Sequence, residues 1–120
     1  MLTALHHQVA GGILVGFALL IVWGVAATVF GRGVTRHHRS ALVAGELLIV
    51  VQSLLGAIMF VGGGRPAQPA LHVLYGLVAL IALPAALGYT RGRPTRWDPL
   101  VVAIACGAVL VIGMRSFETG

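Results

Sequence analysis

The sequence predicts an all-α integral membrane protein, a single four-helix bundle over residues 1–120 that crosses the cell membrane four times with both termini outside. Composition indicates this class, because 58% of the residues are hydrophobic and only 9% are charged. Four separate apolar segments approach the length of about 20 residues that a helix needs to cross the hydrocarbon core. Arginines gather between these segments, in the pattern that orients membrane helices.

The four predicted transmembrane helices occupy residues 8–30, 41–61, 70–90 and 99–115. The first helix follows MLTALHH, which lacks the basic start of a signal peptide, so we expect this helix to be retained. The second helix is expected to begin after Ser40 as its N-cap. Pro69 is suited to the first turn of the third helix. The WDP motif predicts Asp98 as the N-cap of the fourth helix, with Pro99 at its first position.

All eight basic residues are arginines, and six of them lie in two loops. These six are Arg32, Arg36, Arg39, Arg91, Arg93 and Arg96. Positive loops are retained in the cytoplasm, so we place these two loops inside and the GGGRPAQP loop outside with both termini. Only Arg65 and Arg115 fall on the outer side. The net charge of the chain is +5. Because the arginines lie in the loops between apolar segments, we expect this charge to interact with the lipid bilayer and not with nucleic acid.

Two helices that are predicted to run in the same direction carry histidines at their outer ends. His7 is followed four residues later by Gly11, and His72 is followed four residues later by Gly76. Residues four apart share a helix face, so a glycine lies next to each imidazole on the same face. The missing side chain leaves room for a flat macrocycle beside the ligand. His6 is followed at the same spacing by alanine, which favours His7, although the choice between the two stays open.

This arrangement predicts a heme b whose iron is held by His7 and His72 near the outer surface, in the core of the bundle. Arg65 and Arg115 stand where the heme propionates would emerge and offer them charge-assisted hydrogen bonds. Because two axial histidines leave the iron no open position, electron transfer or heme handling is the expected role.

The alternative is a non-catalytic accessory subunit of a respiratory or photosynthetic complex, or a homo-oligomer, in which the histidines bind a pigment singly or nothing. Glycines are common packing residues in membrane helices, and Gly12 and Gly16 fit a simple small-xxx-small contact. Cys106 is interpreted as a small packing residue. His37 and His38 lie in the cationic loop, where metal binding is not expected.

Glu46 is the only acidic residue within the predicted spans. Its burial is costly, so it is either protonated, paired with a loop arginine, or part of a proton path. Small multidrug exporters of this length depend on a glutamate in the first helix. The first helix here has none, so the sequence does not favour an exporter.

The stretch VQSLLGAIMFVGGGRPAQPALHVLYGLVALIALPA resembles part of heme A synthase, from a helix with Q-x-x-L-G through an outer loop with proline to a helix that opens with histidine. HHQVAGGILVGFALLIVWG is similar to that family's other heme-ligating helix. The resemblance covers one half of the family's eight-helix duplicated architecture. It implies His7 and His72 as axial ligands, and Gln52 and Gly56 as helix-packing positions near the porphyrin.

The family's catalytic helix carries a glutamate three residues before its first histidine. Here Ala4 stands at that place relative to His7, and Thr3 relative to His6. Gln8 replaces the arginine that follows the histidine in the family. The acidic residue that the family uses to oxidise a heme methyl group is therefore absent. What the resemblance still implies is the arrangement of helices that holds the heme.

Overall fold

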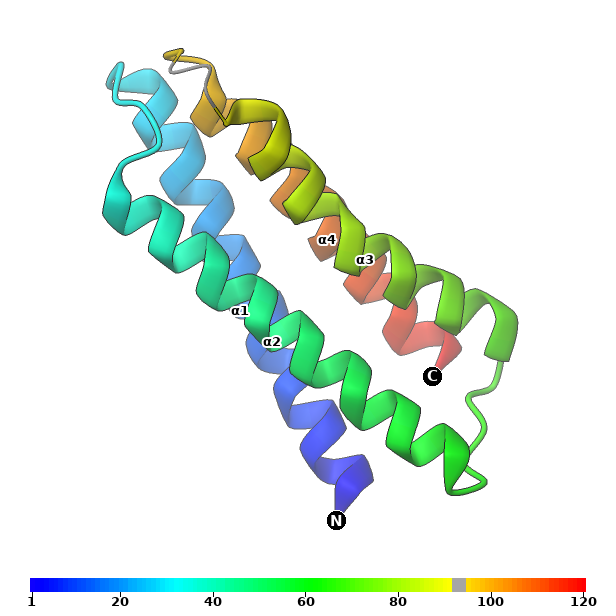
Figure 1. The fold of residues 1–120 in the computed structure, drawn as a ribbon. Helices are drawn as coiled ribbons and strands as arrows, with labels where there is room; N and C mark the ends of the chain where they lie inside the picture. Colours follow the sequence, from blue (N-terminus) through cyan, green and yellow to red (C-terminus); the bar gives the residue numbers. More distant parts are fainter. Residues whose placement is uncertain (92–94) are drawn as a thin grey trace.

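The computed structural model describes residues 1–91 and 95–120 and shows an all-α protein of four packed helices (Figure 1). Each helix is long and apolar enough to cross a membrane, which confirms the predicted fold class. The helices are α1 (Leu2–Val29), α2 (Arg36–Val61), α3 (Pro69–Thr90) and α4 (Asp98–Thr119). The prediction for Arg93 lies outside the described residues.

Both termini lie at one end of the bundle, together with the loop that joins α2 to α3 (Figure 1). We call this the histidine end, because it holds His6, His7 and His72. The opposite end, which carries the loop between α1 and α2 and the start of α4, is called the arginine end. The predicted grouping of termini and loops is therefore confirmed, while the side of the membrane that each end faces stays a prediction.

The helices form a ring in which α1 packs against α2 and α4, and α3 packs against α4 and α2. The two largest interfaces join α4 to α1 and to α3, and the seam between α2 and α3 is the smallest. Consequently α1 and α3 lie on a diagonal of the bundle. The core side chains with less than 2% exposure include Phe17, Leu42, Leu83, Val102, Cys106 and Val109, which confirms the packing role of Cys106.

Close approach of α1 and α4 depends on Gly24. A Cβ atom at this position would lie 2.7 Å from the carbonyl oxygen of Pro99 and 2.8 Å from the Cβ of Ala103. The expected small-xxx-small contact of Gly12 and Gly16 is not formed among the described residues, since a Cβ atom at either glycine would meet nothing within 4 Å there. Because Gly24 has no side chain, α1 and α4 can pack in direct contact at this position.

Two helices begin earlier than their apolar runs. Helix α1 begins at Leu2 and not at residue 8, so His6 and His7 lie in its second turn. Helix α2 begins at Arg36, and its N-cap is Thr35, whose hydroxyl accepts a hydrogen bond from the backbone N–H of His38 at 3.2 Å. The prediction of Ser40 as the N-cap was wrong, because the helix continues beyond its membrane-embedded part.

Pro69 is confirmed in the first turn of α3, whereas Pro99 occupies the second position of α4 and not the first. Asp98 is the first residue of α4 and not its N-cap. Its carboxylate accepts hydrogen bonds from the backbone N–H of Thr95 at 3.0 Å and from the Thr95 hydroxyl at 2.9 Å. Helix α4 also continues past the predicted end at residue 115, to Thr119. Pro84 lies inside α3 and, having no N–H, leaves one backbone carbonyl of that helix without its usual donor.

Candidate functional site

The histidines of α1 and α3 meet across the diagonal of the bundle at the histidine end. The ring centroids of His6 and His72 are 6.3 Å apart, and their planes are inclined by 43°. His7 points elsewhere, with its ring 6.0 Å from that of Phe117 on α4 and inclined by 29°. The structure therefore brings His6 to His72, whereas the sequence pattern favours His7 for that place.

Hydroxyl groups of α4 hold the ring of His72. Its Nδ1 lies 3.3 Å from the Oγ1 of Thr119 and 3.3 Å from the Oγ of Ser116. The Thr119 hydroxyl donates its hydrogen to the backbone carbonyl of Ser116, so toward the imidazole it can only accept. With the ring proton of His72 on Nδ1, the lone pair would lie on Nε2, the form that binds metals.

An amide of α2 holds the ring of His6. The Nε2 atoms of Gln52 and His6 are 3.1 Å apart, and the amide nitrogen is the donor in this contact. The Nδ1 of His6 and the Oε1 of Gln52 are both buried without a hydrogen-bond partner in the part of the chain that the structure describes. If the side-chain amide of Gln52 were flipped, its Oε1 would face the His6 ring and accept a hydrogen bond from Nε2. The lone pair of His6 would then lie on Nδ1.

A glycine lies directly against each of these two rings. A Cβ atom at Gly56 would approach the Cε1 of His6 to 3.3 Å, and one at Gly120 would approach the Cε1 of His72 to 3.0 Å. By contrast, Cβ atoms at Gly11 and Gly76 would meet nothing within 4 Å among the described residues. The two glycines that the spacing singles out therefore do not contact the histidines, whereas Gly56, which the family resemblance indicates, does.

Both arginines of the histidine end have partners within the chain. The guanidinium group of Arg65 donates to the backbone carbonyls of Phe60 at 2.8 Å and of Gly64 at 3.1 Å, and it lies 4.1 Å from the centre of the Phe60 ring. Arg115 forms an exposed ion pair with Glu118 at 2.9 Å. Arg65 thus supports the end of α2. The pairing of either arginine with propionates stays a prediction.

Sequence reasoning did not identify Ser116 and Thr119 as site residues. Their spacing of three places both on one face of α4, opposite the start of α3. Backbone hydrogen bonds join the same segments, from Ala67 to the carbonyl of Gly120 at 3.3 Å and from Gln68 to the carbonyl of Thr119 at 3.0 Å. The signal was therefore a pair of hydroxyl residues at helical spacing next to the predicted end of a span.

At the arginine end, His38 lies in the first turn of α2 and not in a loop. Its ring stacks on that of Trp23 at 4.9 Å between centroids and 7° between planes, and the residue is 1% exposed. Both ring nitrogens are buried with no partner in the described part of the chain. His37 is exposed.

The Oε2 atom of Glu46 is also buried without a partner among residues 1–91 and 95–120. The one ion pair in these ranges is that of Arg115, so the expected pairing of Glu46 with a loop arginine is not formed. A charged carboxylate is costly to bury alone. Of the three alternatives, the neutral carboxyl group fits this environment.

The described residues contain no group of three or more His, Cys, Asp and Glu side chains that could hold a bare metal ion. A porphyrin supplies its own four nitrogens, so a pair of imidazoles is the donor set that the protein must provide for a heme. Comparisons of the chain with protein-family models, with curated proteins and with solved structures find no match. No family is therefore assigned to the four-span membrane protein.

Proposed function

We propose that this protein is a membrane b-type heme protein in which His72 and a histidine of α1 supply the two axial ligands. The observation that supports the proposal is the separation of 6.3 Å between the ring centroids of His6 and His72. A metal–nitrogen bond of about 2 Å, plus roughly 1 Å from nitrogen to ring centre, places two imidazoles on one iron about 6 Å apart. The ring of His7 lies at a similar separation of 6.2 Å from that of His6, but these two residues are neighbours on one helix, whereas His72 comes from α3.

The ring nitrogens also fit a heme. His72 would ligate through Nε2, because Thr119 and Ser116 hold its Nδ1, and a hydrogen bond of this kind orients an imidazole for a metal. His6 would offer its unpartnered Nδ1 once the Gln52 amide is turned, or its Nε2 once Gln52 moves aside. Gly56 leaves the room that the His6 ring occupies.

His7 remains the second candidate for the ligand from α1. Neighbouring residues on a helix are separated by about 100° around its axis, so a rotation of α1 would exchange His6 for His7. The open space at Gly11 lies on the His7 side of the helix. The structure as it stands favours His6, because His7 stacks on Phe117.

A bound heme b would supply a one-electron redox couple. The chain would contribute two axial imidazoles and the hydroxyl groups that orient one of them. With both axial positions taken by protein, electron transfer or the handling of heme is the role that we propose. The places of the heme A synthase glutamate are held by Thr3 and Ala4, so we propose no oxidation of heme.

Absorption spectra of the purified protein test this function. We expect stoichiometric heme with sharp reduced bands in the unmodified protein, loss of heme in His72→Ala, and loss or a labile five-coordinate species in His6→Ala. His7→Ala should retain more heme than His6→Ala. His37→Ala, which removes an exposed histidine at the arginine end, is the matched control and should leave the spectrum unchanged.

Two results would redirect the proposal. A change of spectrum in His7→Ala but not in His6→Ala would make His7 the ligand, as the sequence spacing predicts. A protein that is purified without heme and takes up none from added hemin would remove the cytochrome function altogether.

In that event the second candidate is a non-catalytic accessory subunit of a larger membrane complex, or a homo-oligomer. The observation in its favour is that the same histidines already make hydrogen bonds between helices, His6 to α2 and His72 to α4. Such contacts stabilise helix packing in a membrane without any cofactor. A colourless protein in which His72→Ala lowers the unfolding temperature would support this role.

A further inference from the structure

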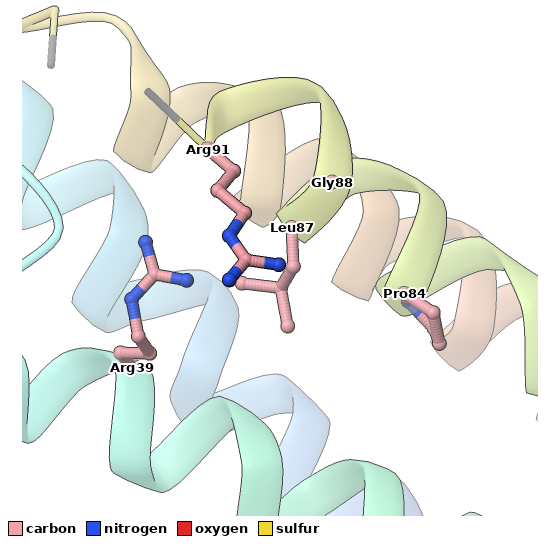
Figure 2. A pocket seen from close by; sticks show the side chains of 5 residues that line it. All are labelled: Arg39, Pro84, Leu87, Gly88 and Arg91. Carbon is pink, nitrogen blue, oxygen red and sulfur yellow. The ribbon is translucent and has the colours of Figure 1, made fainter. Parts of the chain in front are cut away.

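A hollow of about 490 Å³ opens between α2 and α3 at the arginine end. Figure 2 shows that the guanidinium groups of Arg39, from α2, and Arg91, from the end of α3, point into it toward one another. Pro84, Leu87 and Gly88 line the rest of the hollow. Two cations therefore converge on a space whose remaining wall is formed by apolar residues of α3.

No carboxylate neutralises this pair. The chain has three acidic residues, all within the described ranges. Glu118 forms its ion pair at the histidine end, and Asp98 accepts its hydrogen bonds from the loop that precedes α4. Glu46 lies two turns along α2 from Arg39, a rise of about 10 Å. Arg39 and Arg91 have no ion-pair partner in the part of the chain that is described.

Two like charges that line one space repel each other, and an anion between them would reverse the sign of that interaction. Guanidinium groups present a planar fork of N–H donors that matches phosphate oxygens in pairs. A phosphate between Arg39 and Arg91 would be held by donors from two helices. Because α2 and α3 share the smallest interface in the bundle, such an anion would also join the two helices that contact each other least.

We propose that this hollow binds the phosphate group of an anionic phospholipid from the surrounding bilayer. The end of a membrane helix lies at the depth of the lipid headgroups, and basic pockets between helices at this depth recognise them. Pro84, Leu87 and Gly88 provide an apolar surface for the glycerol and upper acyl chain. No acidic side chain lines the hollow to receive the ammonium group of a zwitterionic lipid, which favours an anionic headgroup.

A neighbouring hollow of about 560 Å³ also has Arg39 in its lining. It adds Arg96 as a third cation at the same end of the bundle, and it includes Asp98, whose carboxylate already accepts two hydrogen bonds from Thr95. Arg39 therefore lies between two spaces, and the one that faces the α2–α3 seam is the one without an acidic side chain.

Native mass spectrometry of the full chain, equilibrated with phosphatidylglycerol in mixed micelles, tests the proposal. The unmodified protein should retain phosphatidylglycerol in preference to phosphatidylcholine. The double variant Arg39→Gln/Arg91→Gln should lose about tenfold in affinity for phosphatidylglycerol, because both forks are removed. Arg32→Gln/Arg36→Gln is the matched control, since it removes the same charge from exposed arginines outside the hollow, and should lose less than about twofold.

The conservative variant Arg39→Lys/Arg91→Lys separates geometry from charge. It should bind at a level between the unmodified protein and the glutamine variant, because lysine keeps the charge but not the fork. Equal losses in the hollow and control variants would replace the site by general surface attraction and overturn the proposal. Equal retention of the two lipids would also overturn it. Complete displacement of the lipid by inorganic phosphate at equal concentration would show a site for free anions and not for lipid.

Discussion

The two ends of the bundle satisfy their polar groups in different ways. At the histidine end, Gln52 of α2 holds His6, and hydroxyl groups of α4 hold His72. At the arginine end, the guanidinium groups of Arg39 and Arg91 and both ring nitrogens of His38 have no partner among the described residues. Hydrogen bonds thus align the helices at one end, whereas close apolar packing aligns them at the other. Among the described residues, side-chain hydrogen bonds between different helices are therefore found where the imidazoles meet.

Gly24→Ala should have the largest effect on this contrast, because it attacks the packing on which the arginine end depends. The added Cβ would lie 2.7 Å from the backbone oxygen of Pro99, so α1 and α4 must separate. We expect the free energy of unfolding to fall by about 3 kcal/mol, as for overpacking of a tight core. Titration of the detergent-solubilised protein with a denaturing detergent, followed by circular dichroism, measures this change.

Gly12→Ala is the matched control for that substitution. Its Cβ would meet nothing within 4 Å, and the gain in helix propensity should stabilise the protein by up to about 1 kcal/mol. Equal effects of the two variants would mean that α1 and α4 do not touch at Gly24.

Ser116→Ala combined with Thr119→Val should have the next largest effect, at the histidine end. Both partners of His72 Nδ1 disappear, and the ring is left with an unsatisfied donor at a cost of about 2 kcal/mol in the free energy of unfolding. The same titration measures it. Thr3→Val, which replaces an exposed threonine with no side-chain hydrogen bond among those described, should change little. An unchanged stability in the double variant would show that α3 is not fixed to α4 through His72.

His38→Phe should have the smallest effect of the three, and in the opposite direction. Phenylalanine keeps the stack on Trp23 and removes two buried nitrogens that lack partners, so stability should rise by about 1 kcal/mol. His37→Phe, at an exposed position, provides the control. A loss of stability in His38→Phe would show that a group outside this chain bonds to the His38 ring, and the contrast between the two ends would weaken.

Hydropathy was sufficient to predict the number of helices, their order and the ends at which their loops gather. It failed at the starts of α1 and α2, because hydropathy reports which residues suit the hydrocarbon core, and backbone hydrogen bonding extends further. Thr35 and Ser40 are both acceptable N-caps by residue type. Which of the two caps the helix depends on whether the polar residues between Thr35 and Ser40 are helical. The apolar run does not indicate this.

The pairing at the candidate site was only partly predictable. The depth of His6, His7 and His72 follows from their place in the sequence, so their common end of the bundle could be anticipated. The rotation of α1 could not, because its apolar residues surround the helix and no amphipathic face indicates the core. The i+4 glycine pattern selected His7, but the packing of α1 against α2 turns His6 toward Gln52 and Gly56.

The large interface between α1 and α4 has a consequence for how the protein is made. These are the first and last of the four helices to leave the ribosome, so the face of α1 that carries Gly24 has no packing partner until α4 has been inserted. The preceding helices cannot close the bundle by themselves, since α3 makes its larger interface with α4 as well. Assembly is therefore a single late event, and a nascent chain halted before α4 should be a substrate for membrane quality-control proteases.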